Sequence, residues 1–139
     1  MKSAICRLGV FILAFCIVGN VWSRDLSGQW DLKIEDKSHN VISVLVIKFS
    51  ARKAKSCIGG NWLRVDVVSS TTKDASFFPV SDALSYSIEN SQLIIGRNEI
   101  CDAYLRLRGK LDDEIIRGEY FGFGWESRPL GSFVLSKRK

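Results

Sequence analysis

The side chains that could do chemistry are few in this chain, and their spacing argues against catalysis. His39 is the only histidine among 139 residues, and it lies in the polar, turn-forming stretch 36–40. A Ser-His-Asp triad would have to use this imidazole, which we interpret as a surface residue. Asp112, Asp113 and Glu114 suggest an acid–base pair or a calcium site, but three adjacent acids lack the spaced oxygen ligands of a calcium loop. We therefore predict that the chain is not an enzyme and uses no cofactor.

Two cysteines, Cys57 and Cys101, form the other chemically notable pair. In an exported chain an even pair predicts one disulfide, here closing a loop of about 45 residues, worth roughly 4 kcal/mol in the chain-entropy model. Two free buried thiols are the alternative. Two cysteines and a single histidine lack the ligand spacing of a zinc site, so we predict no bound metal.

The N-terminal residues have the layout of a secretory signal. Lys2 and Arg7 precede the apolar run 8–19, and Val21-Trp22-Ser23 offers residues that a signal peptidase accepts. The run is shorter than the roughly 20 residues of a membrane span, although an uncleaved anchor is the alternative. We predict that residues 1–23 are a signal peptide, that residues 24–139 form a single domain, and that the protein is secreted or periplasmic.

The charge balance narrows the class of partner. The net charge is +5, and removal of Lys2 and Arg7 with the leader leaves 18 basic against 15 acidic residues. This small excess keeps an exported domain soluble but is too weak to indicate nucleic-acid binding. We expect no nucleic-acid partner, and no membrane association once the leader has been removed.

Alternation with a period of two dominates the rest of the chain and predicts strands. Trp30, Leu32 and Ile34 alternate with Asp31 and Lys33, as in a half-buried strand. Turn signals recur every 8–12 residues or so, which is typical of all-β domains. We predict a single antiparallel up-and-down β-barrel of about eight strands, with a two-sheet β-sandwich as the alternative. The expected strands are 30–35, 41–49, 61–69, 84–88, 92–96, 101–108, 115–123 and 131–137.

Glycines followed closely by aromatic residues recur within these strands. They are Gly28/Trp30, Gly60/Trp62, Gly118/Tyr120, Gly122/Phe123, Gly124/Trp125 and Gly131/Phe133. A strand glycine permits a bend or a close backbone approach, and a ring two residues away lies on the same face. Such pairs favour a sheet that curls and closes into a barrel.

The two ends of the chain resemble the calycin superfamily, which includes lipocalins and avidins. The resemblance rests on Gly28-Gln29-Trp30 near the start and on the closing segment from Gly131 to Arg138. It implies a barrel in which the indole of Trp30 closes one end beneath a late basic residue, a cation–π contact of roughly 0.5–2 kcal/mol. Gly28, Trp30 and Arg138 would then be structural residues. Lys137 is the alternative cation, because strand parity allows only one of the two.

Two hypotheses for function follow. In the first, an exported barrel holds a small, largely apolar ligand in its interior, bound by apolar burial. The ligand-lining residues would be Leu32, Leu45, Val65, Leu105, Tyr120, Phe123 and Trp125. In the second, the chain is an exported protein-binding module, an inhibitor or immunity-type protein with a filled core and exposed rings. Its aromatic anchors would be Trp62, Phe77, Phe78, Phe121 and Trp125, and dimerisation would use the same patch.

Overall fold

The computed structural model describes residues 25–139 except 75–76, 79–82, 100, 102–103 and 124–126. The predicted signal peptide and Trp125 lie outside the described residues. The described residues form no helix and eight strands, so the all-β prediction is confirmed. The strands are β1 (Trp30–Asp36), β2 (Val41–Lys53), β3 (Leu63–Thr72), β4 (Leu84–Glu89), β5 (Gln92–Gly96), β6 (Tyr104–Lys110), β7 (Ile115–Phe123) and β8 (Arg128–Lys137). Within this part of the chain no helix is long and apolar enough to cross a bilayer.

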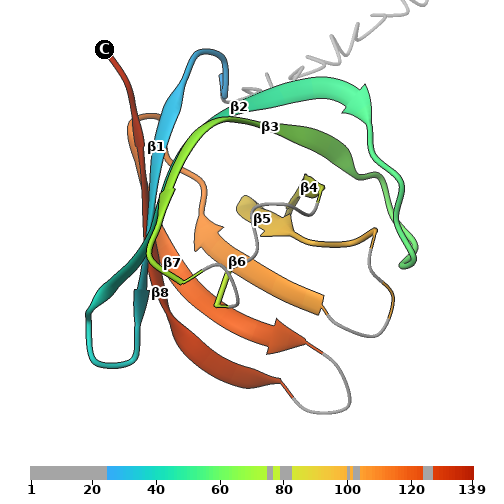
Figure 1. The fold of residues 1–139 in the computed structure, drawn as a ribbon. Coiled ribbons are helices and arrows are strands. Elements are labelled where there is room, and N and C mark those ends of the chain that lie inside the picture. The colour runs from blue at the N-terminus through green and yellow to red at the C-terminus, as the bar shows by residue number, and fades with distance from the viewer. Residues whose placement is uncertain (1–24, 75–76, 79–82, 100, 102–103, 124–126) are drawn as a thin grey trace, which may run out of the picture.

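The strands close into one barrel. Each strand pairs antiparallel with the next, and β8 pairs with β1, with Lys137 opposite Trp30. Figure 1 shows this closure, with the red β8 beside the blue β1. The up-and-down barrel is therefore confirmed, and the alternative sandwich is wrong. Closure also satisfies the backbone groups that the edge strands of an open sheet would expose.

Most of the expected strands are present, with shifted ends. β2 was expected to stop at residue 49 but continues to Lys53, and β3 begins at Leu63 rather than Asn61. The polar residue Lys53 occupies a strand position because pairing with Leu63 of β3, rather than burial, holds it there. Strand ends are set by partners that are distant in the sequence.

Aliphatic and aromatic side chains from every strand fill the barrel interior. The inward positions of β1, Trp30, Leu32 and Ile34, are all 0% exposed, as period-two alternation predicts. The same holds for Ile47, Leu93, Ile95, Leu107, Ile116, Tyr120 and Leu135, with Leu45 and Phe133 at 1%. These side chains pack on one another across the axis and form the hydrophobic core.

Two glycines allow the strands to cross closely. Gly118 lies opposite Phe133 in the β7–β8 register, and a Cβ at Gly118 would overlap the backbone carbonyl of Arg108. At Gly131 a Cβ would overlap the carbonyl oxygen of Glu35. The strands β6, β7, β8 and β1 can therefore approach only without side chains at these positions.

Candidate functional site

The residues predicted to line a ligand chamber belong to the barrel interior. Leu32 and Tyr120 are 0% exposed, Leu45 is 1% and Val65 is 6%, while Leu105 is partly buried and packs against the same core. The side chain of Phe123 and the whole of Trp125 lie outside the described part of the chain. A ligand chamber would leave accessible surface on the side chains that line it. Leu32, Leu45 and Tyr120 have almost none, so they pack as a filled core.

Rings also fill the end of the barrel around Tyr120. The Phe77 ring meets the Tyr120 ring edge-on at 4.9 Å between centroids, and the Phe78 ring does so at 5.6 Å. The Tyr120 hydroxyl donates a hydrogen bond to the carbonyl oxygen of Phe77. Burial raises the pKa of this hydroxyl well above its ordinary value of 10.0, so it stays protonated and remains a donor. The contact ties the segment between β3 and β4 to the interior.

At the Trp30 end the barrel instead opens into a groove of about 500 Å³. This volume is within the roughly 300–1,000 Å³ of known ligand sites. The groove is lined by Asp25, Leu26, Ser27, Phe49, Ala51, Asn61, Leu63, Tyr86, Ser87 and Ile88. The lining comes from the segment before β1, from β2, from the β2–β3 connection and β3, and from β4. It is the candidate site, and we call it the Trp30-end groove.

A bulge in β2 lies beside this groove. Phe49 pairs with Val65 and Lys53 pairs with Leu63, so three residues of β2 face a single residue of β3. Such a bulge bends its strand and removes backbone groups from the ladder. The Tyr86 hydroxyl donates to the displaced carbonyl oxygen of Ser50 at 3.3 Å. A β4 side chain therefore reaches past β3 and contacts the bulge of β2.

The floor of the groove is apolar and largely aromatic. The Phe49 ring meets the Tyr86 ring edge-on at 4.9 Å and the Trp30 ring at 6.1 Å, both between centroids. Ile88, at the rim, is 47% exposed although it is a large aliphatic residue. An apolar molecule seated here would cover Ile88 and the accessible edges of Phe49 and Leu63. Such a concave apolar surface is suited to binding.

The segment before β1 forms one wall of the groove. The Trp30 indole nitrogen donates to the carbonyl oxygen of Leu26 at 3.1 Å, and the Lys137 ammonium donates to that of Asp25 at 3.3 Å. Hydrogen bonds from Ser27 lower the pKa of the Asp25 carboxyl, and the positive charge of Lys137 acts in the same direction. At neutral pH the Asp25 carboxylate is therefore ionised and paired with the Lys137 ammonium, 3.6 Å away.

Strand parity decides which late basic residue covers Trp30. The Lys137 ammonium lies 5.8 Å from the centroid of the Trp30 ring. Arg138 points to the outer face, where its Nε lies 2.8 Å from a carboxylate oxygen of Asp31. The structural role predicted for Arg138 over the indole therefore falls to Lys137, because adjacent residues of a strand point to opposite faces. Gly28 has a φ of 86°, a left-handed conformation that favours glycine.

The β2–β3 connection supplies a second, adjoining pocket of about 340 Å³. It is lined by Lys53, Ala54, Gly60, Asn61, Trp62 and Leu63, and it shares Asn61 and Leu63 with the Trp30-end groove. Trp62 is 5% exposed because its ring lies under the Arg106 guanidinium, 5.6 Å from the ring centroid. Its indole nitrogen donates to the carbonyl oxygen of Gly59 at 3.1 Å. Trp62 thus holds the connection against the outside of β6.

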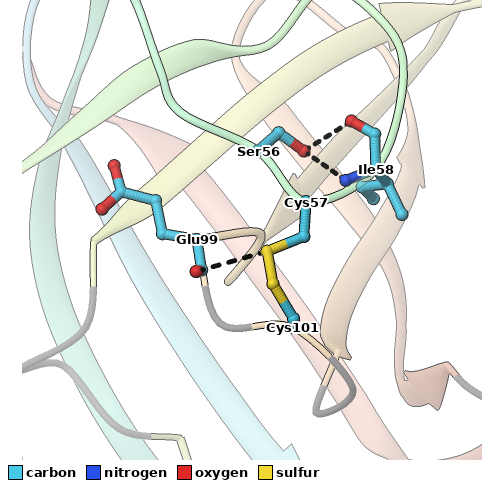
Figure 2. Close-up of a disulfide and its surroundings, with 5 residues drawn as sticks. All are labelled: Ser56, Cys57, Ile58, Glu99 and Cys101. Atoms are coloured by element: carbon cyan, nitrogen blue, oxygen red, sulfur yellow. Dashed lines mark hydrogen bonds between the residues drawn. A yellow bond between two sulfur atoms is a disulfide. The ribbon is translucent and has the colours of Figure 1, made fainter.

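The predicted disulfide fastens this connection. Cys57 and Cys101 are joined, with their Cα atoms 5.5 Å apart. Figure 2 shows the bridge beside the backbone carbonyl of Glu99, and the Ser56 hydroxyl hydrogen-bonded to both the amide and the carbonyl of Ile58. The Cys57 amide also donates to the carbonyl oxygen of Asn98 at 2.9 Å. The bridge therefore ties the wall of the second pocket to the β5–β6 connection.

The described residues include few of the groups that catalysis commonly uses near the groove. Within the described residues, no three side chains of histidine, cysteine, aspartate or glutamate are placed to hold a metal ion. His39 lies in the β1–β2 turn, 3.7 Å from Glu35, with its side chain 83% exposed. Sequence reasoning missed the groove residues Phe49, Tyr86 and Ile88, because they come from strands distant in the sequence and no local pattern brings them together.

Comparison with known proteins identified no relative of this chain. No protein-family model, curated protein or solved structure matches the chain. The calycin relationship therefore stays a prediction, and the candidate site rests on its own geometry.

Proposed function

We propose that this protein is an exported β-barrel binding protein that holds a small, largely apolar ligand in the Trp30-end groove. The observation that carries the proposal is the contrast between interior side chains that are almost fully buried and a concave groove with an apolar floor beside them. The binding free energy comes mainly from apolar burial, at roughly 25 cal/mol per Å². The ligand site proposed from sequence thus moves from the centre of the barrel to its Trp30 end.

Export is part of the same proposal. The apolar leader supports it, and so does the Cys57–Cys101 disulfide, because such bridges persist in oxidising compartments. Cleavage after Ser23 leaves Asp25, a groove residue, next to the new N-terminus. The mass of the protein recovered from the periplasm or medium tests this step, and a mature chain that still carried residues 1–23 would contradict it.

The groove is tested with a neutral fluorescent apolar probe, N-phenyl-1-naphthylamine, titrated into the purified exported protein. Ile88→Glu places a charge on the apolar rim and should weaken probe binding about tenfold or more, because the ligand would desolvate that charge. Ile115→Glu is the matched control: Ile115 is 44% exposed on β7, outside the groove, against 47% for Ile88. This second variant should bind the probe as the unaltered protein does.

Two results would contradict the proposal that the groove is a ligand site. One is equal loss of probe binding in both variants, with both still folded by circular dichroism. The other is a complete absence of probe binding in the unaltered protein. Native mass spectrometry of the protein from its own host gives an independent measurement, and a small adduct released on denaturation supports the ligand carrier.

A protein-binding module is the second candidate, favoured by one feature of β3. β4 pairs with β3 only from Leu63 to Val65, and just beyond this stretch Val67 is 36% exposed and Val68 is 50% exposed. A β-branched surface of this kind suits a protein partner or a second copy of the chain. A co-purifying protein without a small adduct, lost in Val68→Lys, would favour this candidate over the groove.

A further inference from the structure

The Trp30-end groove and the adjoining pocket form a continuous depression along β2 and β3. Their linings share Asn61 and Leu63, and their volumes are about 500 Å³ and 340 Å³. Two hollows joined at common residues suit a ligand that is longer than it is wide. The shared residues come from the end of the β2–β3 connection and the start of β3, where the disulfide-tied segment joins the barrel wall.

The charges at the two ends of this depression differ in how they are paired. Asp25 lines the groove at one end, where its carboxylate lies 3.6 Å from the Lys137 ammonium. Lys53 lines the adjoining pocket at the other end. Between the two lie the apolar residues Phe49, Leu63 and Tyr86. The depression is therefore apolar in the middle, with an ion pair at one end and the lysine ammonium at the other.

Lys53 is placed to present its charge to a ligand. It is opposite Leu63 in the β2–β3 register, and opposed residues of an antiparallel pair lie on the same face of the sheet. Its neighbour Arg52 points away and binds Asp66, with Nη2 2.6 Å from the carboxylate oxygen. Lys53 itself makes no ion pair with any residue that the structure describes. Its ammonium is thus an uncommitted positive charge in a pocket that continues into an apolar groove.

We propose that the ligand of this depression is a single-chain anionic amphiphile, with its charged group at Lys53 and its apolar chain over Phe49, Leu63 and Tyr86. This inference rests on the proposed function, since it names the ligand class of the same groove. Lys53 sets the orientation, because among the described residues the only cation at the other end, Lys137, is already paired with Asp25. The apolar end of the molecule therefore lies toward Ile88 and the segment before β1.

The test compares three ligands with one apolar chain and different charged ends: decanoate, decanol and decyltrimethylammonium. Isothermal titration calorimetry on the unaltered protein should give the tightest binding for decanoate, about three- to fivefold tighter than decanol, the size of one exposed ion pair. The cationic ligand should bind more weakly than decanol. Raising the salt concentration to about 1 M should remove the preference for decanoate, because exposed charges are then screened.

Lys53→Gln is the decisive variant, and Lys48→Gln is its matched control. Both lysines are exposed on β2, but Lys48 pairs in register with Asp66 on the outer face of the barrel. Lys53→Gln should lower decanoate affinity to that of decanol and leave decanol binding unchanged, whereas Lys48→Gln should preserve the preference. Equal binding of decanoate and decanol, or equal losses of decanoate affinity in the two variants, would contradict the proposal of an anionic ligand. The proposal that the groove binds an apolar ligand would be unaffected. If neither decanoate nor decanol binds and the neutral probe does not bind either, both the anionic ligand and the binding function of the groove are contradicted.

Discussion

The Lys137 ammonium lies over the indole of Trp30, 5.8 Å from the ring centroid, and also contacts Asp25. Trp30 is the first residue of β1, and Lys137 is the last of β8, directly opposite it in the register. The contact therefore joins the first and last strands of the barrel. Through Asp25 it also holds one wall of the Trp30-end groove. Closure of the sheet and shaping of the candidate site depend on the same side chain.

Replacing Lys137 should cost more stability than replacing the residue next to it. Lys137→Met keeps an apolar stem but removes the cation over Trp30, and should lower the free energy of unfolding by about 0.5–1 kcal/mol. Arg138→Met makes the same charge change and breaks only the exposed pair with Asp31, at a cost of roughly 0.5 kcal/mol or less. Urea unfolding measures both variants. A larger loss for Arg138→Met would contradict the placement of Lys137 over the indole.

Gly118 should not tolerate a side chain. In Gly118→Ala the new Cβ overlaps the Arg108 carbonyl, which cannot move without breaking the β6–β7 ladder, so we expect a loss of about 3 kcal/mol or failure to fold. Gly59→Ala is the matched control, because a Cβ there meets no heavy atom within 4 Å. It should change stability by less than about 0.5 kcal/mol. Thermal unfolding by circular dichroism measures both, and equal effects would argue against the close strand crossing.

The disulfide should contribute to both stability and binding. Replacing Cys57 and Cys101 together with serine removes a cross-link between residues 44 positions apart, and should lower the free energy of unfolding by about 4 kcal/mol. Because the bridge also holds the connection that supplies Asn61, probe affinity should fall under conditions where the variant is still folded. Urea unfolding and probe titration check the two effects. Unchanged affinity in the folded variant would show that the groove does not depend on the bridge.

The turn between β1 and β2 should weaken in acid. Hydrogen bonds to Asp36, from the Asn40 side chain and then from the backbone amides of Asn40 and Ser38, hold the pKa of its carboxyl below the ordinary value of 3.8. A lowered pKa in the folded state contributes stability that is present above the ordinary value and is lost as pH falls through the folded value. The stability difference between the unaltered protein and Asp36→Asn should therefore shrink as the pH falls through the ordinary pKa of 3.8 and below it.

Urea unfolding at several pH values, with an NMR titration of the Asp36 carboxyl, makes this measurement. Asp113→Asn, in the exposed turn between β6 and β7, controls for the change in net charge. A difference between the unaltered protein and Asp36→Asn that does not vary with pH would contradict the role of these hydrogen bonds.

Local sequence patterns predicted the strand architecture. Alternation in Trp30, Leu32 and Ile34 places all three on one face because successive side chains of a strand point to opposite sides, and all three are buried. The glycine–aromatic pairs likewise indicated close strand crossing, which Gly118 and Phe133 show in register. The candidate site could not be predicted in the same way. Phe49 and Tyr86 come from strands that are distant in the sequence, and their rings meet beside the bulge.

From the amino-acid order alone, alternation and turn residues were enough to predict the strands, and they favoured a closed barrel over a sandwich and a Cys57–Cys101 bridge over two free thiols. The packing in three dimensions was needed to show that closure and that bridge, to place residues such as Leu32 and Leu45 in the core, and to put Lys137 rather than Arg138 over Trp30. Interior packing and register depend on how residues far apart in the chain meet. A period-two pattern gives the face of each side chain but not its neighbour across the barrel.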